Sequence, residues 1–307
     1  MKILVTGSNG FLGMNVTKVL SNAHQTFGVN RSLGMDSYTD RDYLLDINYS
    51  EKLSRLVGEL QIEAIVHCAA KPIVGDCDRD PYGAYHTNTL GTISILEAAR
   101  RNGVKKTLIV ETDKVYGEQT PGTSMTEEYG LNPGSPYELS KALGSMASEF
   151  YRNHYGMDIV QVRPVNLFGP YDYSYSRLVP AMMRSVVKNK PVIIHEEAKS
   201  VYRDLLYAPE AARMIRVLLE SKTKENIYNL SACEPPKTIP EHVKEFCAAM
   251  KYENVETLTK GTSFSEIQYQ SISGHRFMEE FSYHSELSKS RQILETYAWY
   301  EKRLRNA

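Results

Sequence analysis

Hydrophobic and polar positions follow two different periods along the first half of the chain. Short apolar runs predict buried strands at residues 2–6, 26–30, 64–70, 107–112 and 158–164, with one more at 225–231. Between the first five runs, apolar residues recur at helical spacing and predict helices at 11–23, 50–60, 88–103 and 135–156. Strands that alternate with helices are typical of parallel strands joined by crossover helices. The sequence therefore predicts an α/β fold with a doubly wound parallel sheet.

The pattern becomes irregular beyond Phe168. Stretches that carry Tyr and Pro interrupt the apolar runs, and neither an internal repeat nor a low-complexity tract is visible. We therefore expect a second, smaller lobe built from insertions and from the carboxyl-terminal part of the chain, rather than an independent module.

Charge and cysteine content exclude several classes of function. The 307 residues include 36 Lys and Arg and 37 Asp and Glu, so the net charge of −1 gives no field that would attract nucleic acid or an anionic membrane. The four cysteines show no metal-ligand spacing and are too few for a disulfide framework. Neither a signal-peptide core nor a membrane-length apolar run occurs. We expect a cytoplasmic protein without a metal site, in which local cations bind any acidic ligand.

The first predicted strand leads into a glycine-rich turn, "VTGSNGFLG", with Gly7, Gly10 and Gly13. Glycines permit a tight turn and let backbone N–H groups approach a pyrophosphate, and the amino terminus of the following helix favours its negative charge. A purely structural turn is the alternative. The place of this turn, directly between a strand and a helix, favours a dinucleotide site.

The second predicted strand ends in "VNRS", where an enzyme specific for NAD often has an acidic residue for the ribose 2′-hydroxyl. Here the residues are Asn30, Arg31 and Ser32. An arginine beside a hydroxyl suits a 2′-phosphate, so we expect NADP, with NAD possible. The alternative is that Arg31 is a solvated loop cation.

Two further residues, Tyr137 and Lys141 in "SPYELSKALG", are four positions apart on a predicted helix and so share one face. A phenol is a poor base at neutral pH, but a neighbouring ammonium and an oxidised nicotinamide both favour the phenolate. Thr112, at the end of a predicted strand, can complete the hydrogen bonding of a substrate oxygen.

With these motifs in this order, the chain resembles the extended short-chain dehydrogenase/reductase family. Further matches are "HCAA" at 67–70, "NTLGT" at 88–92, "RPVNLFGP" at 163–170 and "YRDLLYAPEAA" at 202–212. The resemblance implies a Rossmann-type domain at 1–166 with 205–232, a smaller nucleotide-sugar lobe at 167–204 with 233–307, and a homodimer formed through two long helices. It implies substrate contacts at Asn166, Arg177 and Arg203, and it implies cofactor contacts at Gly7, Asn9, Gly10, Phe11, Leu12, Gly13, Asn30, Arg31, Ser32, Asp46, Ile47, Ala69, Ala70, Lys71, Asn88, Tyr137, Lys141, Pro164 and Asn166. Lys71 has a solvated position as its alternative.

The stretch "TDKVYG" narrows the expected reaction. Thr112, Asp113 and Lys114 resemble the acid and base residues of sugar-nucleotide 4,6-dehydratases, most closely those of the CDP-glucose type. UDP-N-acetylglucosamine dehydratases also use an Asp and Lys pair, so the sugar stays open. In that reaction Tyr137 takes the O4 proton, Lys114 removes the C5 proton and Asp113 protonates the departing 6-hydroxyl. The roles require a neutral Lys114 and a protonated Asp113, which burial or substrate must produce. A surface ion pair between the two side chains is the alternative.

Three functions stay open from the sequence. A 4,6-dehydratase uses all five residues: Thr112, Asp113, Lys114, Tyr137 and Lys141. An epimerase or a keto-sugar reductase needs Thr112, Tyr137 and Lys141 but not the Asp113 and Lys114 chemistry. A binding protein without activity needs only the glycine turn, and the presence of Tyr137 with Lys141 argues against it.

Overall fold

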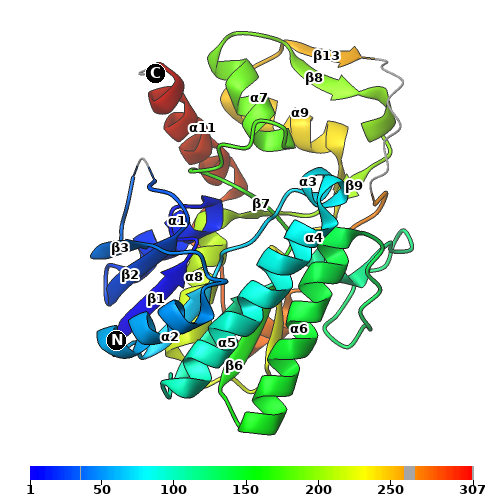
Figure 1. Ribbon diagram of the computed structural model, residues 1–307. Coiled ribbons are helices and arrows are strands. Elements are labelled where there is room, and N and C mark those ends of the chain that lie inside the picture. The colour runs from blue at the N-terminus through cyan, green and yellow to red at the C-terminus, as the bar shows by residue number, and fades with distance from the viewer. Residues whose placement is uncertain (35, 259–266, 306–307) are drawn as a thin grey trace.

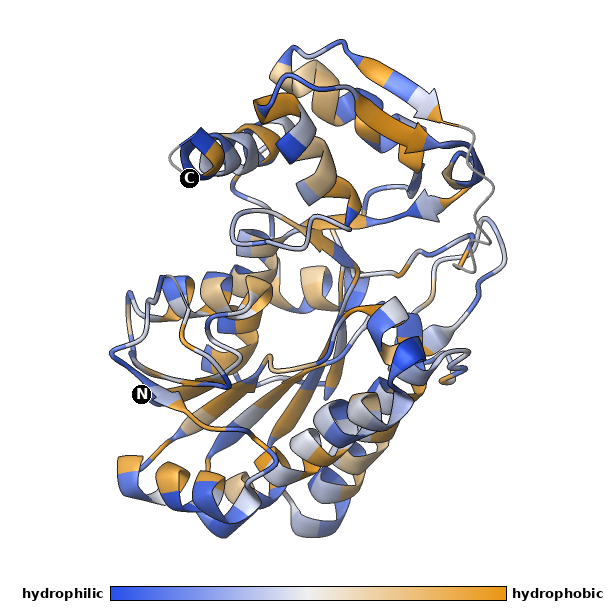
Figure 2. Cartoon of the chain, turned by 45° about the horizontal axis from the view of Figure 1, so that its top comes forward, coloured by the Kyte–Doolittle hydropathy of each residue, from blue (hydrophilic) through white to orange (hydrophobic). Residues whose placement is uncertain are grey.

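The computed structural model describes residues 1–34, 36–258 and 267–305. Its larger lobe is built on a sheet of seven parallel strands in the order β11-β6-β5-β4-β1-β2-β3 (Figure 1). The strands are β1 (Lys2–Thr6), β2 (Gln25–Asn30), β3 (Arg41–Leu44), β4 (Ala64–His67), β5 (Lys106–Val110), β6 (Ile159–Pro164) and β11 (Ile227–Leu230). The central strands β4, β5 and β6 are buried along their whole length because helices cover both faces of the sheet (Figure 2).

Each face of the sheet has its own hydrophobic core. One face packs against α1 (Phe11–Leu20), α8 (Ala208–Glu220) and α10 (His275–Phe281). The other packs against α2 (Ser50–Leu60), α5 (Gly91–Arg101) and α6 (Pro136–Tyr155). Short helical segments join the strands to these helices: α3 (Val74–Arg79), α4 (Pro81–Ala84), η1 (Tyr85–Leu90) and η2 (Asp113–Tyr116). This is the predicted doubly wound α/β fold.

The smaller lobe lies beyond the carboxyl ends of the strands (Figure 1). Phe168, Phe246 and Tyr300 are fully buried in its core. Its elements are α7 (Leu178–Val187), β8 (Val192–His195), η3 (Glu196–Ala198), β9 (Tyr202–Arg203), β12 (Lys237–Thr238), α9 (Ile239–Met250), β13 (Val255–Leu258) and α11 (Lys289–Arg305). Between the lobes, β7 (Asn166–Phe168) pairs in parallel with β10 (Leu205–Tyr207).

Among the differences from the predicted elements, two concern the larger lobe. The edge strand β3 was not predicted, because it is short, polar and partly exposed. The helix α10 belongs to the segment 233–307 that we assigned to the smaller lobe, yet Phe277 packs with Tyr228 of β11 in the larger lobe. Part of that segment, residues 259–266 and 306–307, lies outside the described residues. Within the described residues, no helix is both long and apolar enough to cross a membrane.

Candidate active site

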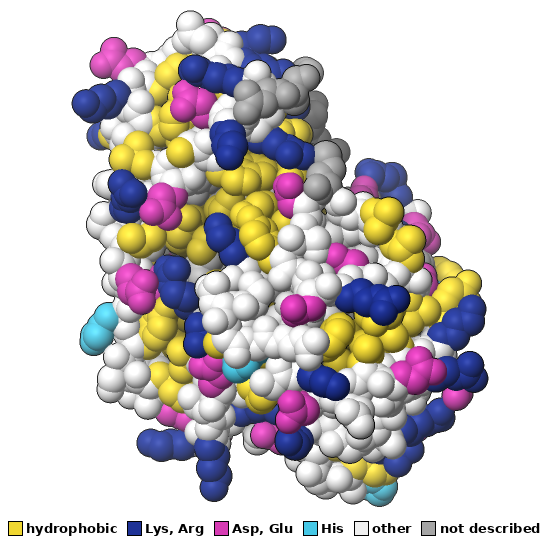
Figure 3. Space-filling model, turned by 90° about the vertical axis from the view of Figure 1, so that its left-hand side faces the viewer, with side chains coloured by type: hydrophobic (Ala, Val, Ile, Leu, Met, Phe, Trp, Pro, Cys, Tyr) yellow, Lys and Arg dark blue, Asp and Glu magenta, His cyan; other side chains and the backbone are white. Residues whose placement is uncertain are grey.

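A cavity of about 1570 Å³ lies between the carboxyl ends of the strands and the smaller lobe. Open parallel sheets bind ligands at this edge. Figure 3 shows hydrophobic side chains gathered on the upper lobe where it meets the hollow between the lobes. The predicted site residues line this cavity, except for Lys71 and Asn88, which are not among its described lining residues.

The glycine turn forms one end of the cavity. Gly7 has a φ of +65°, and a Cβ on Gly13 would lie 1.9 Å from the Gly7 carbonyl oxygen, so side chains at these positions would break the turn. Helix α1 begins after Gly10, which has no side chain to cap it. Its first backbone N–H groups therefore point to the cavity, as a pyrophosphate requires. The turn fits the dinucleotide predicted from the sequence.

Beside the glycine turn, the cavity is lined by the polar residues that the sequence predicts for the adenosine of the dinucleotide, and we call this part the adenosine end. Arg31 and Ser32 line the cavity, and the Ser32 carbonyl oxygen accepts a hydrogen bond from Asn9 Nδ2 at 2.5 Å. Asp46 Oδ1 accepts hydrogen bonds from the backbone and the side chain of Asn48, both at 2.9 Å. The carboxylate is therefore held in place beside the cavity.

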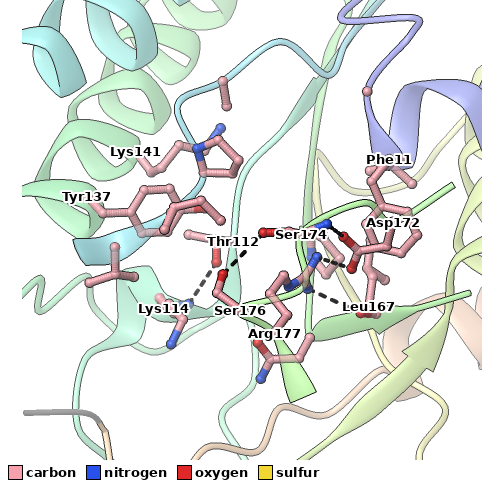
Figure 4. A pocket seen from close by; sticks show the side chains of 18 of the residues that line it. Phe11, Thr112, Lys114, Tyr137, Lys141, Leu167, Asp172, Ser174, Ser176 and Arg177 are labelled. Atoms are coloured by element: carbon pink, nitrogen blue, oxygen red, sulfur yellow. Dashed lines mark hydrogen bonds and ion pairs between the residues drawn. The ribbon is translucent and has the colours of Figure 1, made fainter. Parts of the chain in front are cut away.

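The segment that runs from the end of β5 into η2 contains three predicted catalytic residues. Thr112 precedes η2 in extended conformation, and its Oγ1 accepts the Lys114 N–H at 3.3 Å (Figure 4). Gly117 ends the turn at a φ of +73°, where a Cβ would lie 2.1 Å from the Asn132 carbonyl oxygen. The tight turn directs Asp113 and Lys114 into the cavity.

Asp113 is buried, and its environment changes its acidity. Thr112 donates a hydrogen bond to Oδ1 at 3.3 Å, whereas Oδ2 is buried without a hydrogen-bond partner. Burial raises the pKa of Asp113 to about 6, against the opposing charges of Lys114 and Arg203. The carboxyl group is thus partly protonated near neutral pH and can act as an acid. An exposed ion pair, the alternative left open by the sequence, does not describe a carboxyl group that is 2% exposed.

Tyr137 and Lys141 face the same cavity from the buried side of α6. Ser135 caps this helix by accepting the Glu138 N–H, and Pro136 occupies its first position. Burial raises the pKa of Tyr137 to about 12 and lowers that of Lys141 to about 8. The Lys141 ammonium donates to the Val110 carbonyl oxygen at 2.6 Å, which fixes it between β5 and α6.

The opposite wall carries the predicted substrate contacts. Arg177, at the start of α7, donates to Asp172 at 2.8 Å, and its guanidinium carbon lies 5.4 Å from the centre of the Phe11 ring (Figure 4). Arg203 is 4% exposed, and Asn166 Nδ2 donates to Gln270 Oε1 at 3.4 Å. Two cations and an amide therefore line this wall of the cavity.

Lys71 and Asn88 stabilise the wall instead of lining it. Lys71 forms an ion pair with Asp80 at 2.6 Å. Asn88 Oδ1 accepts the Lys71 N–H at 2.7 Å, and its Nδ2 donates to Ser140 Oγ at 2.9 Å. Asn88 thus joins the segment after β4 to helix α6. Both residues were predicted from motif positions, which do not specify where the side chains point.

Several cavity residues were not predicted from the sequence. Asp172 orients Arg177, and Glu118 accepts the backbone N–H groups of Gln268 and Tyr269. The contacts of Glu118 join residues that lie far apart in the sequence, and Asp172 contacts Arg177 within an irregular segment, so no local motif indicates either residue. No group of His, Cys, Asp or Glu in the described part of the chain is arranged to hold a metal ion.

Comparison with known proteins places the chain in a family. The family model described as "NAD dependent epimerase/dehydratase family" matches residues 3–231. The dTDP-glucose 4,6-dehydratase of Haemophilus influenzae is 26% identical over 98% of each chain. The same enzyme from Bacillus anthracis, solved in complex with NAD, superposes with a TM-score of 0.85 at 25% identity, over 98% of this chain and 97% of that one. The UDP-glucose 4-epimerase of Thermotoga maritima, solved with UDP-glucose, shares the fold with a TM-score of 0.90 at 24% identity, over 99% and 100%.

The family match covers the glycine turn, the β5 strand end and the Tyr137 helix, so the sequence resemblance and the cavity agree. The chain belongs to the NAD dependent epimerase/dehydratase family.

Proposed function

We propose that the chain is a nucleotide-sugar 4,6-dehydratase, which removes one water from a nucleoside-diphosphate hexose. The observation that best supports this proposal is that Asp113, Lys114 and Tyr137 line one cavity. Asp113 is buried there, and burial raises its pKa to about 6. A protonated carboxyl group is what the departure of a hydroxyl requires. Relatives named dTDP-glucose 4,6-dehydratases support the reaction. The resemblance to the CDP-glucose type remains a prediction.

In the proposed reaction, Tyr137, Lys114 and Asp113 each transfer one particular proton. Tyr137 accepts the proton of the 4-hydroxyl with Thr112 as hydrogen-bond partner of the same oxygen, which requires the positive charges of Lys141 and of an oxidised nicotinamide to offset the burial that raises the pKa of the phenol. A nicotinamide dinucleotide, when bound, would accept the hydride from C4 and return it to C6. Lys114 removes the proton at C5, which the C4 ketone acidifies, and later returns it. Asp113 protonates the 6-hydroxyl as it leaves as water. Tyr137 gains one proton and Asp113 loses one, so the number of protons on the enzyme is unchanged after each turnover.

Substitutions at Asp113 and Lys114 test the assignment. Asp113→Asn and Lys114→Met should block water loss but allow oxidation at C4, so reduced cofactor should accumulate and absorb in the near ultraviolet. Tyr137→Phe should block both steps, and Lys188→Met, at the exposed end of α7, should do neither. Normal dehydration with normal deuterium exchange at C5 in both variants would refute the roles of the pair.

The alternative is a 4-epimerase or a 4-keto-sugar reductase. Thr112, Tyr137 and Lys141 would serve either reaction, and the likeness to the Thermotoga maritima epimerase supports the shared fold. Liquid chromatography with mass spectrometry, applied to nucleotide hexoses incubated without added reductant, separates the three. Loss of one water indicates a dehydratase, a product of equal mass with a different retention time indicates an epimerase, and no new product indicates a reductase.

The proposed cofactor is NADP, with NAD as the second candidate because the Bacillus anthracis relative was solved with NAD. Arg31 at the adenosine end of the cavity supports NADP, since a guanidinium can bind the 2′-phosphate. Arg31→Asp should move the affinity ratio toward NAD by about tenfold or more. Equal affinity of the wild type for both dinucleotides, unchanged by the substitution, would refute this choice.

The proposed assembly is a homodimer through α5 and α6. Leu139, Leu143, Met146 and Phe150 form an exposed stripe along α6, at spacings that place them on one helix face. A contiguous apolar helix face of this kind is typical of a subunit interface.

The cytoplasmic location also remains a prediction.

A further inference from the structure

An acidic side chain lies beneath the adenosine end of the cavity, on the edge strand β3. Asp42 is directly opposite Gly28 in the register of β2 and β3. A Cβ at Gly28 would lie 1.9 Å from Asp42 Oδ1 and 2.3 Å from Ser8 Oγ. Only glycine leaves room for the carboxylate to reach across β2, so the strand is built around this side chain.

The carboxylate of Asp42 is held in a network with Asn30 and Ser8. Asn30 Nδ2 donates to Asp42 Oδ1 at 3.0 Å and to Ser8 Oγ at 2.7 Å. Ser8 Oγ donates to the same Asp42 oxygen at 3.0 Å, and the Ser37 hydroxyl donates to the other oxygen. Asn30 and Ser8 are 6% and 2% exposed, so these hydrogen bonds are shielded from water.

The other end of the Asn30 amide supports the phosphate turn. Asn30 Oδ1 accepts the backbone N–H of Asn9 at 3.1 Å. Both N–H groups and the oxygen of the amide are therefore used, which fixes its orientation. A carboxylate at position 30 would have no N–H to give to Asp42 or Ser8, and it would place a second negative charge about 3 Å from the first.

We propose that Asp42 constrains the choice of dinucleotide by limiting which residue is compatible with position 30. As acceptor of the Asn30 amide it tolerates a neutral side chain there but not the carboxylate that would bind the ribose 2′-hydroxyl of NAD, which leaves that end of the site to Arg31. Asp42 is not among the described residues that line the cavity, so it acts through Asn30. This inference deepens the proposed preference for NADP and rests on it.

A charge exchange between the two positions tests the proposal without any need for turnover. Four proteins are compared: the wild type, Asn30→Asp, Asp42→Asn and the double variant, which has the same net charge as the wild type. Thermal unfolding of each protein without dinucleotide reports the coupling, and calorimetric titration with NADP and with NAD reports the selectivity.

The expected pattern is not additive. Asn30→Asp should lower the melting temperature by several degrees and weaken the binding of both dinucleotides, whereas Asp42→Asn should remain close to the wild type. The double variant should recover the melting temperature, because an amide at 42 can donate to a carboxylate at 30. Its ratio of NAD to NADP affinity should rise at least tenfold over the wild type.

Two results would overturn the proposal. One is that Asn30→Asp alone changes selectivity as far as the double variant with no loss of stability, since positions 30 and 42 would then be independent. The other is that Asp42→Asn selectively loses NAD, since Asp42 would then be a ribose ligand. A wild type that prefers NAD would refute the proposed cofactor but not the coupling, which the unfolding of the four proteins still measures.

Discussion

Asp113 is a buried acid whose ionised form the fold disfavours. Its pKa is raised from the usual 3.8 to about 6, so the folded chain loses stability as the pH rises through this interval. Two pH units correspond to about 3 kcal/mol, which is an upper limit for the cost above pH 6. We therefore predict that Asp113→Asn stabilises the protein by about 1–3 kcal/mol at pH 8 and by nothing at pH 4. Urea unfolding at the two pH values measures this.

The matched control is Glu253→Gln, because Glu253 is an exposed acid in the smaller lobe. The Glu253→Gln protein should differ from the wild type in stability by the same small amount at pH 4 and at pH 8. A destabilised Asp113→Asn protein at pH 8 would show that the ionised carboxylate makes favourable contacts, and the proposed acid role would lose its physical basis. A gain in stability with a loss of dehydration is the usual trade-off at an active site.

Single residues also show how far the sequence could predict the site. Thr112, Tyr137 and Lys141 were found because each motif has a fixed place on a strand end or a helix face. Asp42 could not be found, because its role depends on Gly28 in the neighbouring strand and on the register that pairs them. The sequence also suggested that Lys141 would favour ionisation of Tyr137, whereas burial dominates and raises the pKa of that phenol to about 12.

Among the elements, the connection between β2 and β3 is joined to the smaller lobe by aromatic contacts. The hydroxyl groups of Tyr38 and Tyr171 lie 2.6 Å apart, and the Tyr171 ring packs edge-on against Trp299 of α11 with centroids 5.3 Å apart. Tyr171 has a φ of +73°, a strained value for a residue with a side chain. Asp36 and Arg303 form an ion pair at 3.9 Å beside this cluster. The contacts join a segment at the adenosine end to a wall of the cavity.

We predict that Tyr171→Phe speeds the release of the dinucleotide by about three- to tenfold, the effect of losing a hydrogen bond worth about 1 kcal/mol. Trp299 is the one tryptophan of the chain, so its fluorescence reports this cluster directly. Tyr175→Phe is the control, since Tyr175 packs on Tyr300 in the smaller lobe. An unchanged release rate in Tyr171→Phe would show that the two lobes hold the dinucleotide independently of this contact.

The strands β5 and β6 are joined at their carboxyl ends by a buried ion pair. Arg163 Nε donates to Glu111 Oε2 at 2.8 Å, and its other nitrogens donate to Tyr116 at 2.9 Å and to Ser145 at 3.1 Å. Because removal of one partner leaves a buried charge uncompensated, Glu111→Gln should destabilise the chain by about 3–5 kcal/mol. Glu128→Gln, which breaks an exposed pair with Arg276, should cost less than about 1 kcal/mol. Similar urea midpoints for the two variants would contradict this account.

The elements predicted in the first half of the chain have a regular apolar period, whereas the helices α7, α8 and α9 were not predicted although each buries one side. The six predicted strands are present because each is a short apolar run, which is the pattern of a strand buried on both faces of a sheet. The short strands β7, β9, β10 and β12 were not predicted, because two or three residues show no period and their pairing is set by the approach of the lobes. The strands predicted at 64–70 and 107–112 end earlier than expected, at His67 and Val110. Beyond these residues the chain lines the cavity.

For the molecule as a whole, the exposed apolar face of α6 is the surface through which we propose that the dimer forms. Met146 and Phe150 are 60% and 55% exposed, and they continue the stripe begun by Leu139 and Leu143. Burial of such side chains contributes about 1.5–3 kcal/mol each, so a pair of these faces can hold two copies together. A twofold axis would place the same residues on both sides of the contact.

We predict that the wild type is a dimer and that Met146→Asp with Phe150→Asp converts it to a monomer at micromolar concentration, because two carboxylates per subunit would face each other in an apolar contact. Light scattering after size exclusion measures the mass. Tyr49→Asp, at an isolated residue that is 60% exposed on the larger lobe, should leave the dimer intact. Tyr137 and Lys141 lie on the buried side of the same helix, so loss of the partner should also lower thermal stability near the site. A wild type that stays monomeric at all concentrations would assign the stripe to some other contact.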